Sequence, residues 1–216
     1  MKAILFDWDG TLVDSLGAYF EANRWVMDHF GLPFDEGLYR RHYAPDWRLQ
    51  YRALGVPEER LPEAQELWRT RFSLRDARLL PGVDVALPAL AGAGYRLGLV
   101  TATERDSAEP LIARLRLDRV LEARVFGDDL PVHKPDPAPL RLALERLGHD
   151  GPPGDVIYVG DAVPDMQMAR AVGTRAVGVR SILGDPDELR SAGAETVVPS
   201  VAAWTADLLG RSALEG

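Results

Sequence analysis

A chain of 216 residues, 46% of them hydrophobic, is long enough to bury one sizeable core with a smaller appendage. Its 33 acidic residues outnumber its 25 basic ones and give a net charge of −8, so the surface should repel nucleic acids and anionic membranes. The chain contains no cysteine, which excludes disulfides, thiolate metal sites and cysteine nucleophiles. Any metal ion must therefore be held by oxygen or by histidine nitrogen.

Short apolar runs bounded by glycine, proline or aspartate alternate with segments of helical spacing. The apolar runs cover residues 3–9, 95–102, 123–127, 155–161 and 174–179, and two of the helical segments cover residues 137–147 and 164–172. Alternation of this kind is typical of right-handed crossovers between parallel strands. The pattern predicts an α/β fold with an open, Rossmann-like parallel sheet.

The interval between the first and second apolar runs is much longer than one crossover helix requires. It carries three helical patterns, at about residues 15–30, 36–53 and 58–77, separated by glycine–proline breaks. We therefore predict a core domain of residues 1–14 and 80–216, with an inserted helical cap of residues 15–79. Trp25, Trp47 and Trp68 lie in this cap and are expected to fill its core.

Polar side chains follow several of the predicted strands. Asp7, Thr101 and Asp161 each stand at the end of an apolar run, and Lys134 follows another run by a short loop. Ligands of open parallel sheets bind at the carboxyl ends of the strands, so we expect these residues to meet at one edge. Only two of the 25 basic residues are lysines, and Lys134 is the internal one, which indicates a need for a compact point charge there.

Four carboxylates, those of Asp7, Asp9, Asp161 and Asp165, are expected to face this single lysine. Carboxylates gathered in a dry site repel each other and raise each other's pKa unless a cation lies between them. Oxygen ligands favour a hard cation such as Mg²⁺, which would also polarise a phosphoryl oxygen. The sequence therefore predicts a magnesium site.

Four motifs appear in the order typical of one enzyme superfamily. They are DWDGTLVDS at 7–15, Thr101 after GLV, HKPDP at 133–137 and VGDAVPDMQMARAVG at 159–173. Together they resemble the motifs of the haloacid dehalogenase (HAD) superfamily, in its phosphoglycolate phosphatase-like branch with an inserted helical cap. The resemblance spans most of the chain, and it implies the same α/β core with an inserted cap.

The resemblance also assigns roles to the carboxylates. It makes Asp7 the nucleophile that forms an aspartyl-phosphate, and Asp9 the group that protonates the leaving alcohol and later activates water. The backbone carbonyl of Asp9 is expected to join Asp7, Asp161 and Asp165 around the metal ion. Asp161 is the expected direct ligand, whereas Asp165 either binds through water or orients a ligand or Lys134.

The remaining site residues are expected to hold the substrate. Lys134 and the hydroxyl of Thr101 would act on the transferring phosphoryl group. The substrate-binding residues that we predict are Trp8, Gly10, Thr11, Ala102 and Arg48. Gly10 permits a tight turn whose backbone N–H groups can cradle phosphoryl oxygens, and Ala102 would contribute its backbone N–H. Asp129 is expected to support Lys134.

The expected activity is Mg²⁺-dependent hydrolysis of a small phosphomonoester, either phosphoglycolate-like or a sugar phosphate. The alternatives are a phosphosugar mutase of the same superfamily and a non-catalytic binding protein on this scaffold. Asp9 disfavours carbon–halogen cleavage, because dehalogenases that resemble this chain lack an acidic residue there. We expect a small phosphorylated metabolite as the partner, no nucleic acid or membrane partner, and a monomer. The N-terminus is far short of a signal peptide, so a cytoplasmic location is expected.

Overall fold

The computed structural model describes residues 2–212 and divides into two compact units. The larger unit consists of residues 1–14 and 78–216, and the smaller one of residues 15–77. The predicted boundary at which the chain re-enters the core domain is residue 80, two residues later than in the structure. Arg78 and Leu79 belong to the larger unit because they pair with the first segment of that unit, as described below.

The larger unit is built on a parallel sheet. Within residues 2–212 the sheet has six strands in the order β5-β4-β1-β6-β7-β8, and every neighbouring pair is parallel. The strands are β1 (Ala3–Phe6), β4 (Arg96–Val100), β5 (Leu121–Val125), β6 (Val156–Gly160), β7 (Arg175–Val179) and β8 (Thr196–Val198). The strand order reverses direction at β1, where open α/β sheets bind their ligands. The predicted Rossmann-like α/β core is confirmed.

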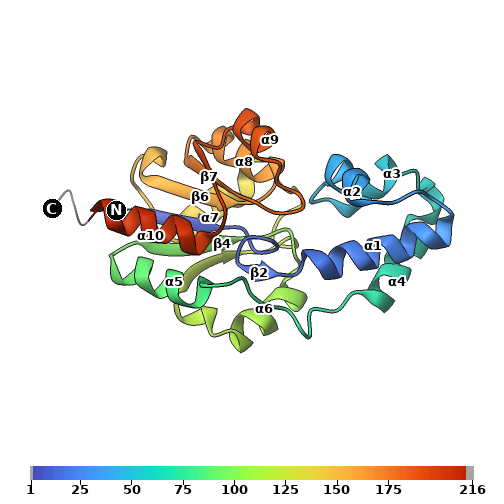
Figure 1. The fold of residues 1–216 in the computed structure, drawn as a ribbon, viewed down its shortest axis with the longest axis horizontal. Coiled ribbons are helices and arrows are strands. Elements are labelled where there is room, and N and C mark those ends of the chain that lie inside the picture. Colours follow the sequence, from blue (N-terminus) through green and yellow to red (C-terminus); the bar gives the residue numbers. More distant parts are fainter. Residues whose placement is uncertain (1, 213–216) are drawn as a thin grey trace. The chain divides into compact units, whose positions relative to one another are not determined.

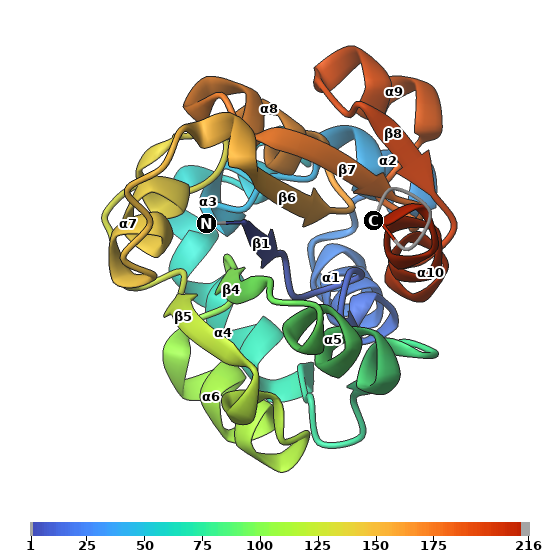
Figure 2. The same ribbon diagram turned by 90° about the vertical axis from the view of Figure 1, so that its left-hand side faces the viewer.

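Helices cover both faces of this sheet. They are α5 (Val83–Gly92), α6 (Arg105–Arg114), α7 (Ala138–Arg146), α8 (Val163–Val172), α9 (Pro186–Ala192) and α10 (Val201–Ser212), with short 3-10 helices η2 (Leu117–Arg119) and η3 (Pro153–Asp155). Figure 2 shows α7, α8 and α9 on one face and α5, α6 and α10 on the other. This arrangement buries β1, β4 and β6 between two helical layers, which is why their sequences are continuous apolar runs.

One apolar core of the larger unit lies under the α7–α8–α9 face, and buried residues of α5, α6 and α10 pack on the other face. Leu140 and Leu144 from α7, Met166 from α8 and Leu189 from α9 pack on the sheet, and all are buried. A core on each side of the central strands fixes the positions of the strand ends. The site described below therefore stands on rigid elements.

A small antiparallel ribbon accompanies the sheet. It consists of β2 (Val13–Asp14) and β3 (Arg78–Leu79), and it joins the two places where the chain crosses between the units. Leu80 N–H also donates to the carbonyl oxygen of Leu12 at 2.9 Å. The ribbon is too short to produce a sequence pattern and was not predicted.

The smaller unit is helical (Figure 1). Its elements are α1 (Leu16–Phe30), α2 (Glu36–His42), α3 (Trp47–Ala53), η1 (Glu58–Arg60) and α4 (Leu61–Arg71). The segment predicted as one helix over 36–53 is two helices, because Pro45 disfavours helical backbone at the residue before it and Asp46 caps α3 by accepting from Arg48 N–H at 3.0 Å. The helix predicted over 58–77 ends at Arg71, where Phe72 becomes extended.

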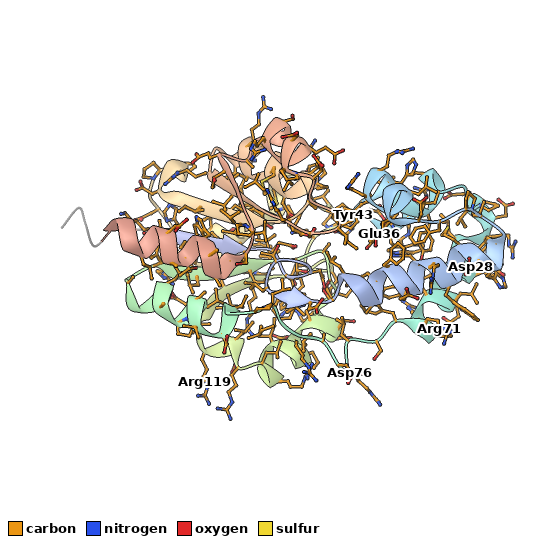
Figure 3. All side chains as sticks on the ribbon, viewed as in Figure 1. Asp28, Glu36, Tyr43, Arg71, Asp76 and Arg119 are labelled. Atoms are coloured by element: carbon orange, nitrogen blue, oxygen red, sulfur yellow. The ribbon has the colours of Figure 1, made fainter. Side chains whose placement is uncertain are left out.

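The core of the smaller unit joins α1, α3 and α4. Its buried cluster includes Met27 and Tyr51. Trp47 and Trp68 are partly buried and pack against this cluster, as predicted. Trp25 is the exception, since 44% of its surface is exposed. Arg71 stacks over the Trp25 ring at 4.2 Å, and its side chain, like that of Asp28, is exposed (Figure 3).

No helix among residues 2–212 combines the length and the apolar content that crossing a bilayer requires.

Candidate active site

The carboxyl ends of the central strands bring the predicted polar residues together. Asp7 continues β1 and donates its backbone N–H to the carbonyl of Val159 in β6 at 2.8 Å. Thr101 continues β4 and donates to the carbonyl of Val125 in β5 at 2.9 Å. Asp161 follows β6 directly, next to β1 in the sheet. Backbone pairing therefore sets these side chains side by side at one edge, as the sequence predicts.

The turn after β1 is tight. The carbonyl of Trp8 accepts from the backbone N–H groups of Leu12 and Val13 at 2.9 and 3.0 Å, and Gly10 donates to Val13 at 2.9 Å. Gly10 has a φ of 74°, which a residue without a side chain adopts at little cost. Trp8 is fully buried, and its contact with a substrate stays a prediction.

Lys134 lies between two carboxylates. Its Nζ donates to Asp7 Oδ1 at 2.5 Å and to Asp165 Oδ1 at 2.8 Å, and only 5% of its side chain is exposed. The geometry explains why the chain uses a lysine here, because one compact ammonium group bridges two carboxylates from different elements.

Asp165 is itself held by several donors. Tyr158 O–H donates to Oδ1 at 3.1 Å, and the backbone N–H of Ala162 donates to Oδ2 at 3.1 Å. A side chain at Gly160 would meet the Asp165 carboxyl group at 2.6 Å, so this packing requires glycine. Asp165 therefore both caps the start of α8 and orients Lys134. The sequence analysis did not identify Tyr158 or Gly160, although both lie in the apolar run that ends at Asp161.

Burial and mutual repulsion shift the protonation of the site. Burial, with repulsion by Asp165 and Asp9, raises the pKa of Asp7 to about 7, although the Lys134 charge acts to lower it. The pKa of Asp161 is raised well above its usual range, chiefly by burial and then by Asp7 and Asp165. Burial alone would lower the pKa of Lys134, but attraction to Asp165 and Asp7 outweighs it and the pKa is raised. The lysine therefore stays charged, and its single charge does not neutralise all three aspartates.

The residues present fit a divalent cation. Oxygen atoms of Asp7, Asp161 and Asp165 lie within 4.8 Å of one another, and all three residues are buried. Within the described part of the chain, Asp161 Oδ2 is buried without a hydrogen-bond partner, while Asp161 Oδ1 accepts from Thr11 Oγ1 at 3.4 Å. An orphaned carboxylate oxygen in a cluster with excess negative charge is stabilised by a cation or by a proton, and the raised pKa of Asp161 reflects the second case when no metal is bound. Mg²⁺ accepts carboxylate oxygens as ligands and usually completes its coordination with water.

The loop after β4 holds the predicted hydroxyl. Thr101 is buried, and its Oγ1 accepts from the backbone N–H of Thr103 at 3.0 Å, which leaves its own proton to point elsewhere. Ala102 is half-buried in the same loop. Thr103 was not identified from the sequence, yet its hydroxyl donates to Asp9 Oδ2 at 2.5 Å. The only sequence signal was a second threonine two residues after Thr101.

Two residues that the sequence analysis assigned to the site, Asp129 and Arg48, make hydrogen bonds or ring contacts with groups other than Lys134 and the aspartate cluster. Asp129 does not support Lys134 directly, and that prediction is wrong: its carboxylate accepts from Arg105 at 2.6 Å, from Arg146 at 2.5 Å and from Phe126 N–H at 3.1 Å. The two arginines and the Phe126 amide hold the pKa of Asp129 below its usual range, against the opposing effect of burial. Arg48 belongs to the smaller unit, where its guanidinium stacks over Trp47 at 4.9 Å, and its contact with a substrate stays a prediction.

The fold is an open, Rossmann-like parallel sheet between helices, with three buried aspartates and one lysine gathered at the carboxyl ends of its central strands. The model of the haloacid dehalogenase-like hydrolases matches residues 4–179, and the chain belongs to that family. The resemblance read from the four motifs is therefore confirmed, and the protein is an enzyme of this family.

Named relatives cover nearly the whole chain. A phosphorylated carbohydrates phosphatase of Thermotoga maritima is 34% identical over 216 residues, which covers 92% of this chain and 94% of that protein. A phosphoglycolate phosphatase of Cupriavidus necator is 35% identical and covers 94% of this chain and 91% of that protein. The solved structure of a hydrolase from Pseudomonas syringae superposes with a TM-score of 0.81 at 26% identity, covering 94% of this chain and 95% of that one.

Proposed function

We propose that this protein is a Mg²⁺-dependent phosphatase that hydrolyses a small phosphomonoester through an aspartyl-phosphate at Asp7. The observation that carries the proposal is the placement of Lys134 between Asp7 and Asp165, next to the orphaned oxygen of Asp161. A binding protein with no chemistry to perform has no use for buried carboxylates that repel each other. The bound cation would neutralise the carboxylates and polarise the phosphoryl group.

Each side chain has a defined task in this proposal. A carboxylate oxygen of Asp7 attacks phosphorus, while Lys134 restrains that carboxylate and offsets charge on the phosphoryl oxygens. The Thr101 hydroxyl and the backbone N–H groups after Asp9 position the phosphoryl group. Asp9 gives a proton to the departing alcohol and then takes one from the water that hydrolyses the aspartyl-phosphate.

We propose a phosphorylated carbohydrate or a phosphoglycolate-like acid as the substrate. Relatives named for these two activities match the chain at 34% and 35% identity over nearly its whole length, so neither is favoured over the other. The role of residues 15–79 as a cap, a cytoplasmic location and a monomeric state stay predictions.

A panel of phosphorylated metabolites, assayed for phosphate release with and without Mg²⁺, tests the activity. We expect release from at least one sugar phosphate or phosphoglycolate, and its loss with excess chelator. Release without any added sugar acceptor would separate a phosphatase from a mutase. Absence of turnover with every ester at millimolar Mg²⁺ would refute the proposal.

Substitution of Asp9 by Asn tests the acid–base role. Asn keeps the shape of the side chain and can accept the bond from Thr103, but it cannot donate a proton as an acid does. We expect kcat to fall by about 10²–10⁴-fold, the usual scale for general acid–base groups. Steady-state kinetics of phosphate release measure this change, and a decrease of less than about twofold would exclude the role.

A further inference from the structure

Thr103 has all three of its polar groups engaged at the active-site edge of the sheet. Its backbone N–H donates to Thr101 Oγ1 at 3.0 Å, its carbonyl accepts from Gly127 N–H at 3.0 Å, and its hydroxyl donates to Asp9 Oδ2 at 2.5 Å. The residue is buried. Through its backbone and its side chain, this one residue links the loop after β4 to the loop after β5 and to the turn after β1.

The loop that carries Thr103 has little freedom to move. A Cβ atom at Gly127 would lie 2.0 Å from the carbonyl oxygen of Ala102, so the two backbones are in direct contact. Asp128 accepts from the backbone N–H of Arg105 at 2.9 Å and ties the same two loops together. Thr103 is also β-branched, which restricts its χ1 rotamers. The position of its hydroxyl is therefore set by the scaffold.

We propose that Thr103 is a positioning residue for Asp9, which fixes the rotamer of the carboxyl group by donating a hydrogen bond to Oδ2. Because Oδ2 accepts this hydrogen bond, the proposal assigns proton exchange with the substrate and with water to Oδ1. The inference rests on the proposed function, since it assumes that Asp9 protonates the leaving group.

The step can be written in full. A carboxylate oxygen of Asp7 forms a bond to phosphorus as the bond between phosphorus and the ester oxygen breaks, and the proton on Asp9 Oδ1 passes to that ester oxygen. The products are the aspartyl-phosphate, a neutral alcohol and the Asp9 carboxylate. Water then attacks phosphorus, gives one proton to Asp9 Oδ1 and releases phosphate from Asp7. In both steps Thr103 keeps its own proton and holds Oδ2.

The test compares two esters that differ in their need for this proton. An alkyl phosphate releases a basic alkoxide unless it is protonated, whereas p-nitrophenyl phosphate releases a stabilised phenolate. The value of kcat/KM reports transfer to Asp7, the step in which the leaving group departs. For Thr103→Val we expect kcat/KM to fall by about 10–100-fold with the alkyl ester, the scale of a misplaced catalytic group, and by less than about threefold with the aryl ester.

Two further variants serve as controls. Thr103→Ser retains the hydroxyl and should stay within about threefold of the unaltered enzyme with both esters. Thr174→Val removes a buried hydroxyl that donates to the carbonyl of Ala169 in α8. Thr174 directly precedes β7, at the amino end of that strand and not at the carboxyl end, so the ratio of the two kcat/KM values should stay unchanged. Circular dichroism and melting temperature check that each variant is folded. If Thr103→Val does not fold, Thr103→Ala replaces it.

The outcomes are distinct. Equal losses with both esters, or no loss with either, would overturn the positioning role, as would failure of Thr103→Ser to restore the alkyl ester reaction. If the unaltered enzyme hydrolyses neither ester nor any other phosphomonoester, the proposed function itself fails, and the inference fails with it.

Discussion

Replacement of Asp7 by Asn is expected to abolish phosphate release while leaving the protein folded. Asn has no anionic oxygen to attack phosphorus, so the aspartyl-phosphate cannot form. We expect kcat to fall on the order of 10⁴–10⁶-fold, the range measured for the central members of an established nucleophilic site. The measurement is phosphate release under saturating substrate and Mg²⁺.

The fold should tolerate this change. The Asn side-chain oxygen can still accept the hydrogen bond that Lys134 donates at 2.5 Å, and one of three mutually repelling charges is removed. The melting temperature should therefore be equal to or higher than that of the unaltered protein without metal. Asp84→Asn, at an exposed position in the first turn of α5, is the matched control and should keep full activity. Full activity of Asp7→Asn would refute the nucleophile assignment.

Replacement of Lys134 by Met is expected to reduce both rate and stability. The sequence alone favours a loss of rate with little loss of stability, because an isolated lysine in a loop suggests a purely catalytic charge. The structure adds the second effect, since the buried ammonium group is the partner of Asp7 and Asp165. Removing one partner of a buried ion pair costs about 3–5 kcal/mol, which corresponds to about 6–20 °C in melting temperature for a chain of this size.

The loss of rate has a separate cause. Met fills the volume but offers no charge to the phosphoryl oxygens, so we expect kcat to fall by about 10²–10³-fold, the scale for loss of one transition-state donor. Kinetics and thermal melts, both in saturating Mg²⁺, measure the two effects. Lys2→Met changes the chain's other lysine, at an exposed position, and should alter neither quantity. An unchanged rate in Lys134→Met would assign Lys134 a structural role alone.

The sequence predicts the central strands and their polar ends well because these features are local. Continuous apolar runs mark β1, β4 and β6, and Asp7, Thr101 and Asp161 follow them directly. Residues that directly follow neighbouring parallel strands lie at the same edge of the sheet, and this placement does not depend on contacts elsewhere in the chain. The family motifs add the roles of these residues.

Other parts of the site depend on contacts between distant segments and leave no local pattern. Thr103 and Tyr158 reach Asp9 and Asp165 through rotamers that only the packed structure defines. Asp129 is a second example: it lies only five residues before Lys134 in the sequence, whereas the fold brings Arg105 and Arg146 to it from α6 and α7. The strand β8 is only three residues long and was not predicted for that reason.

Without metal, the folded protein should become less stable as the pH rises from about 4 to about 7. Asp7 has an ordinary pKa of 3.8 when unfolded and about 7 when folded, so between these values the folded state binds more protons than the unfolded state. By linkage, the free energy of unfolding falls as the pH rises through this window. The raised pKa of Asp161 acts in the same direction. A cation that neutralises the cluster should remove this penalty.

The most direct test of the account is therefore the melting temperature at pH 8, with chelator and with Mg²⁺, at constant ionic strength. If the three carboxylates bind the cation, Mg²⁺ at 100 times its Kd should stabilise the protein by about 2.7 kcal/mol, or about 5–10 °C. Asp161→Asn should melt no lower than the unaltered protein in chelator and should lose this Mg²⁺ response. No shift with Mg²⁺ in the unaltered protein, or an equal shift in Asp161→Asn, would contradict the claim that a divalent cation holds these carboxylates together.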